Sequence, residues 1–546
     1  MTYLVTTNLD IGMLILYFAV LIGNGIYFSL KKTKHGDDFL LGGSSFGVFA
    51  TLCTQGATMK GSGALLGYSA GAYANGTGVL ISSQCYSIGA WIAVLSGIAR
   101  KIRKCASVVR IRSAGDLFER RFESPILKKM AGIGGGWLAL SILSSQMAAL
   151  GLLVHLLFGK YGLSFEAALI IGVVVAVIYT SVGGLVSVVY NDVFQWLVMT
   201  PMIFLVLPGM LLFSQGITPQ ALHSALDSVQ YFSLRPNIWW LGYLLSGVLA
   251  ACSDVSHLTR FIAAKDERTA VTGSMLGFAY CTLFAGVIIY FGLSATVLVK
   301  PEILGGNNDG VLFALISQIL PAGLVGLFVA AILATTISTL DSYLQVSVVC
   351  LMIDVIEPVL PATTSDRQKL TYCRLITVII ALLAASFVLK VKGILAVVSI
   401  GYSVYSSGMF LPLMCCMFWK KATEKGCLGG MLAGAGSCIV ALQTKLPLPI
   451  VWGVAASLIV TVGLSLATYR EDSARALLPG FDEQGLKIDA DICKASILGA
   501  IGSLLISIGI GMWVNWICII IGAAGLWACI ALMKRAFDQY LPAAKA

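Results

Sequence analysis

Residues 332–344 read ILATTISTLDSYL, and they lie inside the longer apolar run GLVGLFVAAILATTISTLDSYLQVSVVCLMI at 323–353. Asp341 is the only charged residue of this run. A charge at membrane depth costs at least a few kcal/mol unless it is paired or hydrated. The stretch therefore predicts a membrane helix that contains a polar site. Its polar residues are Thr335, Thr336, Ser338, Thr339, Asp341 and Ser342.

The spacing of these residues places most of them on one face of a helix. At 100° per residue, positions i, i+3, i+4 and i+7 share one narrow arc. Several oxygens on one strip can replace part of the water shell of a small cation. Hydroxyl groups alone more often bond back to the preceding turn or bridge helices, but the added carboxylate favours a cation. The residues on the arc are Thr335, Ser338, Thr339 and Ser342, with Asp341 beside Ser338.

Composition sets the class of the whole chain. It is 58% hydrophobic and 11% charged over 546 residues, and its mean hydropathy is +0.90. Because a bilayer core takes about 20 apolar residues per helix, we predict an all-α polytopic membrane protein with about 15 transmembrane helices. The predicted parts are an N-terminal helix with an inward loop (1–44), a first repeat (45–214), an outward loop (215–236), a second repeat (237–418) and further C-terminal helices (419–546).

Basic residues predict the orientation. Ten Lys and Arg fall between Arg100 and Lys129, as cytoplasmic loops require. The first apolar segment has neither a basic leader nor a cleavage pattern, so we expect it to be a retained helix. We therefore expect an integral protein of the plasma (cell inner) membrane, with the N-terminus outside and the C-terminus cytoplasmic. Topology explains the net charge of +10 better than a nucleic-acid partner does.

Two segments predict broken helices. TQGATMKGSG at 54–63 and SGVLAACSDVSH at 246–257 each place small residues around one charge, Lys60 or Asp254. Paired interruptions of this kind mark the binding site of transporters built from inverted repeats. A misplaced helix end is the alternative interpretation. If both helices are broken, we expect Lys60 and Asp254 to form an ion pair or to hold a solute between them.

Four ordered motifs resemble the solute:sodium symporter family. They are FLLGGSSFGVFATLCTQGATMKGSGALLG at 39–67, YTSVGGLVSVVYNDVFQ at 179–195, HLTRFIAAKDE at 257–267 and AAILATTISTLDS at 330–342. The resemblance implies the leucine-transporter fold of two inverted five-helix repeats, with one extra N-terminal helix and about four extra C-terminal helices in this chain. It also implies symport coupled to a cation, with Na⁺ as the transported coupling ion.

Site residues follow from the same resemblance. The family's main sodium site would use the hydroxyls of Ser338 and Thr339 with the backbone carbonyls of Ala57, Lys60 and Thr335. Hard oxygen ligands of this kind suit Na⁺. A second arrangement found in some members would use Asp192 with Ser338, Asp341 and Ser342.

The chain also departs from its relatives. Where several members have an Asp, this chain has Met59, and the neighbouring Lys60 brings an ammonium beside the presumed sodium site. The alternative is a proton-coupled or sodium-independent transporter in which Lys60 takes the place of sodium. Asp254 stands where some members have Gln, which makes the solute site more acidic.

Lys60 and Asp254 together suit a small carboxylate or zwitterion better than a neutral sugar. Other polar residues are expected to face the same cavity, although Ser and Gln in membrane helices more often tie helices together. The expected solute-binding residues are Lys60, Gln84, Gln146, Ser253, Asp254, Tyr402 and Tyr405, with Ser145 and Ser256 nearby.

Rival classes fit less well. A channel would need pore-lining rings or a filter loop. An enzyme would need a catalytic constellation, and the chain has no HExxH, GxSxG or P-loop pattern. A sensor would need a signalling domain. We therefore predict a secondary active transporter that is not an enzyme, whose partners are a small solute and the lipid bilayer, with no nucleic acid. The extension 469–546 is expected to pack peripherally or to contact a second copy in a homo-oligomer.

Overall fold

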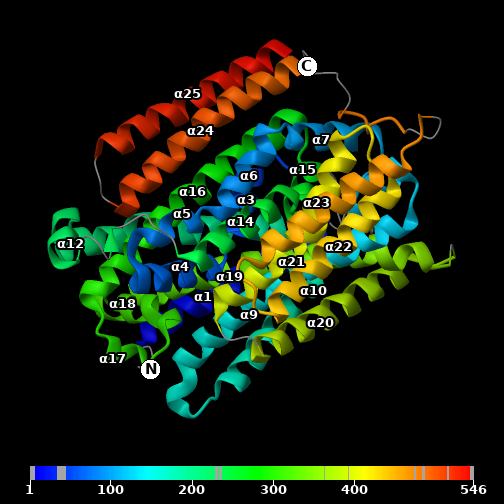
Figure 1. Cartoon of the computed structure of the whole chain (residues 1–546). Helices are drawn as coiled ribbons and strands as arrows, with labels where there is room; N and C mark the ends of the chain where they lie inside the picture. The colour runs from blue at the N-terminus through cyan, green and yellow to red at the C-terminus, as the bar shows by residue number, and fades with distance from the viewer. Residues whose placement is uncertain are drawn as a thin grey trace.

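The computed structural model describes residues 6–32, 45–227, 231–232, 237–361, 363–390, 393–471, 475–481, 486–512 and 516–540. Within these ranges the regular elements are helices, and the only β-pairing is an isolated bridge between Phe46 and Ala264. The all-α prediction is therefore confirmed. Figure 1 shows the helices as one bundle, with the beginning of α1 and the end of α25 on opposite sides.

The first half of the bundle contains α1 (Asn8–Lys32), α3 (Val48–Met59), α4 (Ser62–Asn75), α5 (Val79–Ser83), α6 (Cys85–Leu95), α7 (Ile98–Val108), α8 (Ala114–Phe122), α9 (Pro125–Phe158), α10 (Phe165–Pro201), α11 (Leu207–Gly209) and α12 (Pro219–Ala225). The second half contains α14 (Ile238–Ser253), α15 (Val255–Ala263), α16 (Glu267–Leu298), α17 (Pro301–Leu304), α18 (Val311–Ile319), α19 (Leu324–Val349), α20 (Asp366–Lys390), α21 (Ile394–Phe418), α22 (Glu424–Gln443), α23 (Pro449–Thr468), α24 (Leu486–Met512) and α25 (Trp516–Tyr540).

Twelve helical spans in the described part are long and apolar enough to cross a membrane, and shorter apolar helices cover Asn8–Asn24 and Phe165–Val174. The expected number of about 15 is not confirmed. One reason is that the apolar stretch at 45–73 is divided near Lys60, which leaves α3 with 12 residues. Another is that residues 165–214, which are long enough for two of the expected helices, form α10 and its continuation, π-helical in part, to Ser214.

Helix α19, which contains the opening stretch, lies at the centre. In the span Leu324–Val359, which contains α19, 89% of an 18-residue apolar stretch is buried inside the protein. The corresponding share for the last helix, α25, is 17%. Helices α9, α10 and α3 pack around α19. In Figure 1 the hairpin of α24 and α25 lies outside the bundle, where α24 packs on α16 and α6. The extension is thus a peripheral addition to the bundle.

Both predicted interruptions are present. Helix α3 ends at Met59 and α4 begins at Ser62, so Lys60 and Gly61 lie between two helical halves. Helix α14 ends at Ser253, and α15 begins at Val255. Asp254 occupies that break, and its side chain accepts a hydrogen bond from the Ser256 N–H at 2.6 Å, which caps α15. Each break therefore coincides with a charged residue of the sequence.

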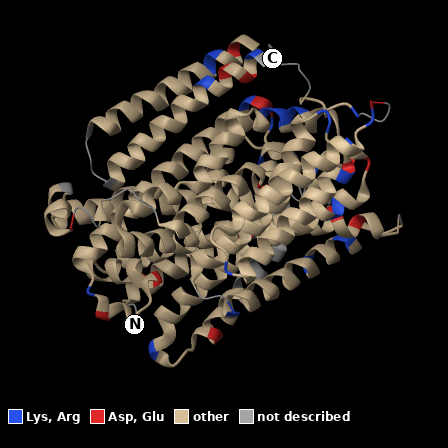
Figure 2. Ribbon diagram, in the orientation of Figure 1, with Lys and Arg blue, Asp and Glu red and all other residues tan. Residues whose placement is uncertain are grey.

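Charged residues lie mostly near the ends of the helices (Figure 2). The Arg100 guanidinium on α7 lies 2.5 Å from Asp489 at the start of α24 and 3.1 Å from Glu267 at the start of α16. Lys128 bridges Asp116 and Glu119. These ion pairs fix the ends of the bundle and leave its apolar length to face lipid.

The cap at the second break predicts a difference between two substitutions of Asp254. Asp254→Ala removes the cap, which contributes about 1 kcal/mol, and the acceptor of the Tyr343 hydroxyl at 2.7 Å. Asp254→Asn keeps one acceptor oxygen, which can still accept from the Ser256 N–H and cap α15. We expect the alanine variant to unfold at a lower temperature than the asparagine variant in detergent. Equal melting temperatures would show that the cap does not stabilise α15.

Candidate cation and solute site

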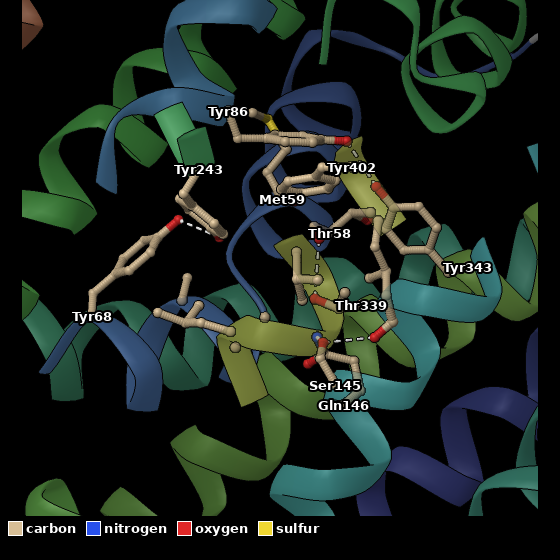
Figure 3. A pocket seen from close by; sticks show the side chains of 16 residues that line it. Thr58, Met59, Tyr68, Tyr86, Ser145, Gln146, Tyr243, Thr339, Tyr343 and Tyr402 are labelled. Carbon is tan, nitrogen blue, oxygen red and sulfur yellow. Dashed lines mark hydrogen bonds between the residues drawn. The ribbon is translucent and has the colours of Figure 1, made fainter. Parts of the chain in front are cut away.

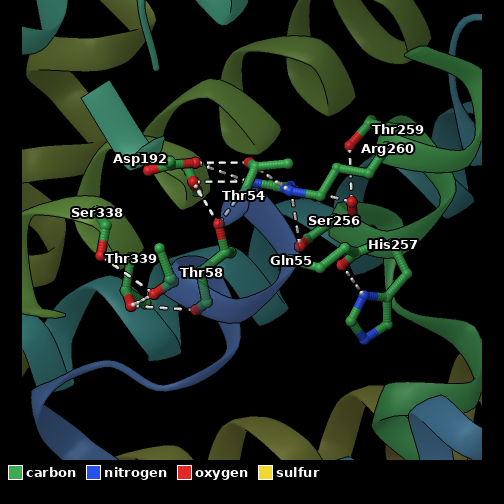
Figure 4. A network of polar contacts seen from close by, with 12 residues as sticks. Thr54, Gln55, Thr58, Asp192, Ser256, His257, Thr259, Arg260, Ser338 and Thr339 are labelled. Atoms are coloured by element: carbon green, nitrogen blue, oxygen red, sulfur yellow. Dashed lines mark hydrogen bonds and ion pairs between the residues drawn. The ribbon is translucent and has the colours of Figure 1, made fainter. Parts of the chain in front are cut away.

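Helix α19 meets the last turn of α3 through hydroxyl groups (Figure 4). The Ser338 and Thr339 hydroxyls lie 3.1 and 3.4 Å from the Ala57 carbonyl oxygen. Thr339 Oγ1 also lies 3.1 Å from the Thr58 carbonyl, and both hydroxyls bond back to the Thr335 carbonyl. Five oxygens from two helices therefore converge on one buried point.

The break in α3 makes this convergence possible. The last four carbonyls of a helix have no partner within it, and Ala57 and Thr58 fall in the last turn of α3. Their carbonyls are free to accept from α19 or to coordinate an ion. Neutral hydroxyl and carbonyl oxygens are the ligands that hard cations prefer. The structure thus brings together Ala57, Thr335, Ser338 and Thr339, four of the five residues that the resemblance implies, and it adds Thr58 in place of the Lys60 carbonyl.

A small cavity lies beside this point, between the first break and α9 (Figure 3). Its volume is about 30 Å³, which is room for about two water molecules. An organic solute can enter it only if the surrounding side chains move. Among the residues that line it are Thr58, Met59, Gly61, Tyr68, Tyr86, Ser145, Gln146, Tyr243, Thr339, Tyr343 and Tyr402.

The N-terminus of α4 points at Gln146 on α9. Gln146 Oε1 accepts from the Ser62 N–H at 2.9 Å and from the Ser62 hydroxyl at 2.7 Å. A helix N-terminus carries a partial positive charge and free N–H groups, so it favours a carboxylate. Gly61 permits the close approach, because a Cβ there would lie 2.5 Å from Gln146 Oε1 and 2.6 Å from Thr339 Oγ1.

Tyrosines form the other wall of the cavity (Figure 3). The hydroxyls of Tyr86 and Tyr343 lie 2.8 Å apart, and Tyr343 donates to Asp254 Oδ2 at 2.7 Å. The ring of Tyr402 stacks on that of Tyr86, with centroids 5.5 Å apart. Asp254 therefore reaches the cavity through the Tyr343 hydroxyl.

Lys60 does not form the expected ion pair with Asp254. The Asp254 carboxylate is held by Tyr343 and the Ser256 N–H, and within the described residues Lys60 Nζ has no hydrogen-bond partner. Lys60 is fully buried, and its Nζ lies 5.6 Å from the ring centroid of Tyr68. Of the two alternatives, the ion pair is therefore absent, because the second break satisfies its own charge with nearby groups. Lys60 is left as a buried basic side chain between two cavity-lining residues, Met59 and Gly61.

Arg260 on α15 occupies the region of the second predicted cation arrangement (Figure 4). Its guanidinium donates to the Ser342 hydroxyl at 2.7 Å and lies 3.9 Å from Asp192 Oδ2. Thr54 donates to the same Asp192 oxygen at 2.5 Å. Asp341 is buried on the same helix as Ser342. Asp192 and Ser342 are therefore brought together, with a guanidinium between them.

Three predicted solute residues face elsewhere. The Gln84 amide, between α5 and α6, donates to the Thr282 carbonyl at 3.0 Å and to Ser507 on α24 at 2.8 Å. The Ser253 hydroxyl bonds back to Leu249. The Tyr405 hydroxyl donates to the Ser253 carbonyl at 2.6 Å. These side chains bond within or between helices, whereas Gln146 and Tyr402 line the cavity as predicted.

Sequence reasoning missed several residues of the site. Arg260 stands in the quoted motif HLTRFIAAKDE, but nothing in the sequence indicated that its side chain is buried. Tyr343 follows Thr339 by one helical turn in the opening stretch, a spacing that could have identified it. The other missed residues are Thr58, Tyr68, Tyr86 and Tyr243.

Comparison with known proteins finds a family model and relatives that are named as symporters or transporters. A sequence model of the sodium:solute symporter family matches residues 39–434. A sodium/proline symporter of Salmonella typhimurium is 25% identical over 77% of this chain and 85% of its own. An osmoregulated proline transporter of Bacillus subtilis is 25% identical over 86% of this chain and 97% of its own. A sodium/pantothenate symporter of Haemophilus influenzae is 24% identical over 80% of this chain and 90% of its own.

Among solved structures, a substrate-bound, outward-open Na⁺-coupled sialic acid symporter aligns with a TM-score of 0.67. The alignment has 19% sequence identity and covers 84% of this chain and 98% of that one. The similarity concerns the fold.

The tight approach at Gly61 predicts a sensitive position. In Gly61→Ala, the new Cβ would displace Thr339 Oγ1 or Gln146 Oε1. We expect the half-saturating Na⁺ concentration to rise about tenfold, which corresponds to about 1.4 kcal/mol of binding free energy. The melting temperature of the purified protein, recorded at increasing Na⁺ concentrations, gives the half-saturating Na⁺ concentration.

Gly63→Ala is the matched control, because a Cβ there would meet Ser145 Oγ at an ordinary distance of 3.4 Å. Its Na⁺ response should be close to that of the wild type. Equal effects of the two substitutions would contradict the role assigned to the Gly61 contact.

Proposed function

The chain belongs to the sodium:solute symporter family, and from this premise we propose that it uses the Na⁺ gradient to take up a small zwitterionic or carboxylated solute by alternating access. One observation carries the proposal: the hydroxyls of Ser338 and Thr339 converge with the Ala57 and Thr58 carbonyls at the end of α3. These oxygens are the ligands that we assign to Na⁺, together with the Thr335 carbonyl.

The same geometry accounts for coupling. An ion bound by α3 and α19 together holds these two helices at a fixed distance, so its arrival and loss bias the arrangement of the bundle. Thr339 lines the solute cavity as well. Because the two sites share this residue and the first break, each ligand affects the affinity for the other.

Three groups support a carboxylate in the solute. They are the α4 N-terminus, the Gln146 amide that now occupies it, and the buried ammonium of Lys60. At the opposite wall, the Tyr343–Asp254 pair suits a cationic nitrogen. Proline and pantothenate, the solutes named for the relatives, both carry a carboxylate. A zwitterion of amino-acid size matches both walls.

Coupling to protons through Lys60 is not favoured. An ammonium that replaced Na⁺ would donate hydrogen bonds to the oxygens of the sodium site. Lys60 Nζ donates none to any of the described groups, and the hydroxyls of Ser338 and Thr339 contact the Ala57 carbonyl instead.

We assign the inverted repeats to 45–214 and 237–418, with the N-terminus outside the plasma membrane and the C-terminus inside the cell. The basic helix α7 lies on the side of the bundle where α25 ends (Figure 2), and cytoplasmic loops are rich in Lys and Arg. This charge distribution supports the orientation.

The sodium assignment predicts the effect of removing each hydroxyl. Ser338→Ala and Thr339→Ala should each raise the half-saturating Na⁺ concentration about tenfold or more, because a lost ligand at membrane depth is not cheaply replaced. The half-saturating Na⁺ concentration is measured from the uptake of radiolabelled proline and related zwitterions into vesicles, with and without a Na⁺ gradient.

Thr336→Ala is the control, since the Thr336 hydroxyl bonds only to the Ile332 carbonyl of its own helix, at 2.7 Å, among the contacts of the described residues. Its Na⁺ dependence should match the wild type. Wild-type Na⁺ dependence in the Ser338 and Thr339 variants would exclude the assignment.

Lys60→Met should raise the KM for a carboxylated solute by about tenfold or more, because hydrogen bonds to charged groups contribute about 1.5–3 kcal/mol. The residual uptake should remain Na⁺-dependent. Inhibition by the methyl ester of the solute, which lacks the carboxylate, should be equal in variant and wild type. Uptake driven by a pH gradient in sodium-free wild-type vesicles would instead make Lys60 the proton carrier.

A further inference from the structure

The C-terminal hairpin of α24 and α25 holds helix α6 at both of its ends. Gln84, the residue just before α6, donates to the Ser507 hydroxyl of α24 at 2.8 Å. Soon after α6 ends, the Arg100 guanidinium donates to both carboxylate oxygens of Asp489, at 2.5 and 2.9 Å. At 1.5 Å per residue these two contacts are about 27 Å apart along α24, close to the ~30 Å depth of a bilayer core. Helix α24 therefore follows α6 across most of the membrane.

Close approaches between the two ends leave little room for α6 to move against the hairpin. A Cβ on Gly499 of α24 would lie 2.8 Å from the Trp91 ring of α6. Trp91 also donates to the Thr282 hydroxyl of α16 at 3.3 Å. A Cβ on Gly286 of α16 would lie 2.4 Å from the Ser507 carbonyl oxygen. Helices α6, α16 and α24 therefore form one closely packed unit.

Helix α6 in turn carries part of the solute cavity. Tyr86, in its first turn, lines the cavity and places its hydroxyl 2.8 Å from that of Tyr343. Further along α6, a Cβ on Gly89 would lie 2.1 Å from the Val248 carbonyl oxygen of α14. The Cys252 thiol of α14 donates to the Gly89 carbonyl at 3.3 Å. A shift of α6 would therefore move Tyr86 and disturb α14, the helix that leads to the second break.

We infer that α24 is a brace for the solute site, and that Ser507 is a positioning residue that sets the place of Tyr86 in the cavity by way of Gln84. This inference rests on the proposed uptake of a zwitterion at this cavity. Ser507 is not among the described residues that line the cavity, so its effect on the solute passes through α6. The hairpin follows residues 39–434, which the family model matches, so the brace is an addition to that part of the chain.

The side chain of Gln84 explains how the brace acts. Gln84 separates α5 from α6, and a short helix depends on tertiary contacts for its position. Since lipid offers no hydrogen-bond partner, the buried amide N–H groups need acceptors within the protein. They find the Thr282 carbonyl at 3.0 Å and the Ser507 hydroxyl. Without that hydroxyl one N–H loses its acceptor, which favours rotation of the amide and a shift of the first turn of α6.

Ser507→Ala tests the brace. We expect the KM for Na⁺-dependent uptake of radiolabelled L-proline, or of pantothenate if the wild type takes up no proline, to rise about fivefold, because a buried N–H is left unpaired. The maximal rate should stay near that of the wild type. Na⁺ binding without solute, obtained from the melting temperature at increasing Na⁺ concentrations, should not change, because the proposed cation ligands lie on α3 and α19.

Ser503→Ala is the matched control on the same helix. The Ser503 hydroxyl is also buried, and among the contacts of the described residues it bonds to the Ala500 carbonyl of its own helix, at 3.0 Å. Its KM should match that of the wild type. Gln84→Met removes the amide and should itself raise the KM. Adding Ser507→Ala to Gln84→Met should then cause no further increase, because the two residues act through one contact.

Hydrogen–deuterium exchange tests the brace without any solute. The backbone amides of residues 85–95 should exchange faster in Ser507→Ala than in the wild type or in Ser503→Ala. Asp489→Asn, which weakens the contact at the other end of α6, should have the same effect.

Wild-type exchange in α6 of both Ser507→Ala and Asp489→Asn would overturn the inference. A lower melting temperature of Ser507→Ala with an unchanged KM would also overturn it, and would make the hairpin a structural support only. Additive effects of Gln84→Met and Ser507→Ala on the KM would show that Ser507 does not act through Gln84. Wild-type uptake that ignores Na⁺ would contradict the proposed function instead, and the exchange measurement would still decide on the brace.

Discussion

A backbone polar group inside a bilayer finds its partner within the protein, because lipid offers none. Two helices of this bundle are interrupted, at Lys60–Gly61 and at Asp254, and each interruption frees carbonyls and N–H groups at membrane depth. The partners they find form the site. Hydroxyls of α19 donate to the end of α3, Gln146 accepts from the start of α4, and the Asp254 carboxylate accepts from the start of α15.

Coupling between ion and solute follows from how these partners are shared. Thr339 contacts the end of α3 and lines the cavity, while Thr58 contacts both Thr339 and Arg260. A change at any one of the three points therefore alters the packing of α3 against α19. Such a chain of contacts is a physical basis for linkage, because both ligands bias the same two helices.

Both helix breaks and several residues of the site could be predicted from the sequence, and the residues that could not be predicted depend on packing. The positions of both breaks were predictable, since a charge among small residues within an apolar run is typical of a helix interrupted at membrane depth. Ser338 and Thr339 were predictable from helical periodicity and from the family resemblance. Gln84, Ser253 and Tyr405 were wrongly expected at the cavity, because periodicity gives the relative directions of side chains but not which neighbour each direction meets. Arg260 was missed for a related reason: a basic residue after a broken helix has the pattern of a cytoplasmic loop, and only packing shows that it turns inward.

The order of binding in the proposed symport follows from the acids around the two breaks. Asp192, Asp254 and Asp341 are buried there, and Lys60 has no hydrogen-bond partner within the described residues. A solute carboxylate that arrived first would approach these acids with no bound cation beside Ser338 and Thr339. Na⁺ arriving first would offset their negative charge and order the end of α3, and with it the break that presents the α4 N-terminus. In this order the ion prepares the solute site, and the solute then supplies the partner that Lys60 lacks.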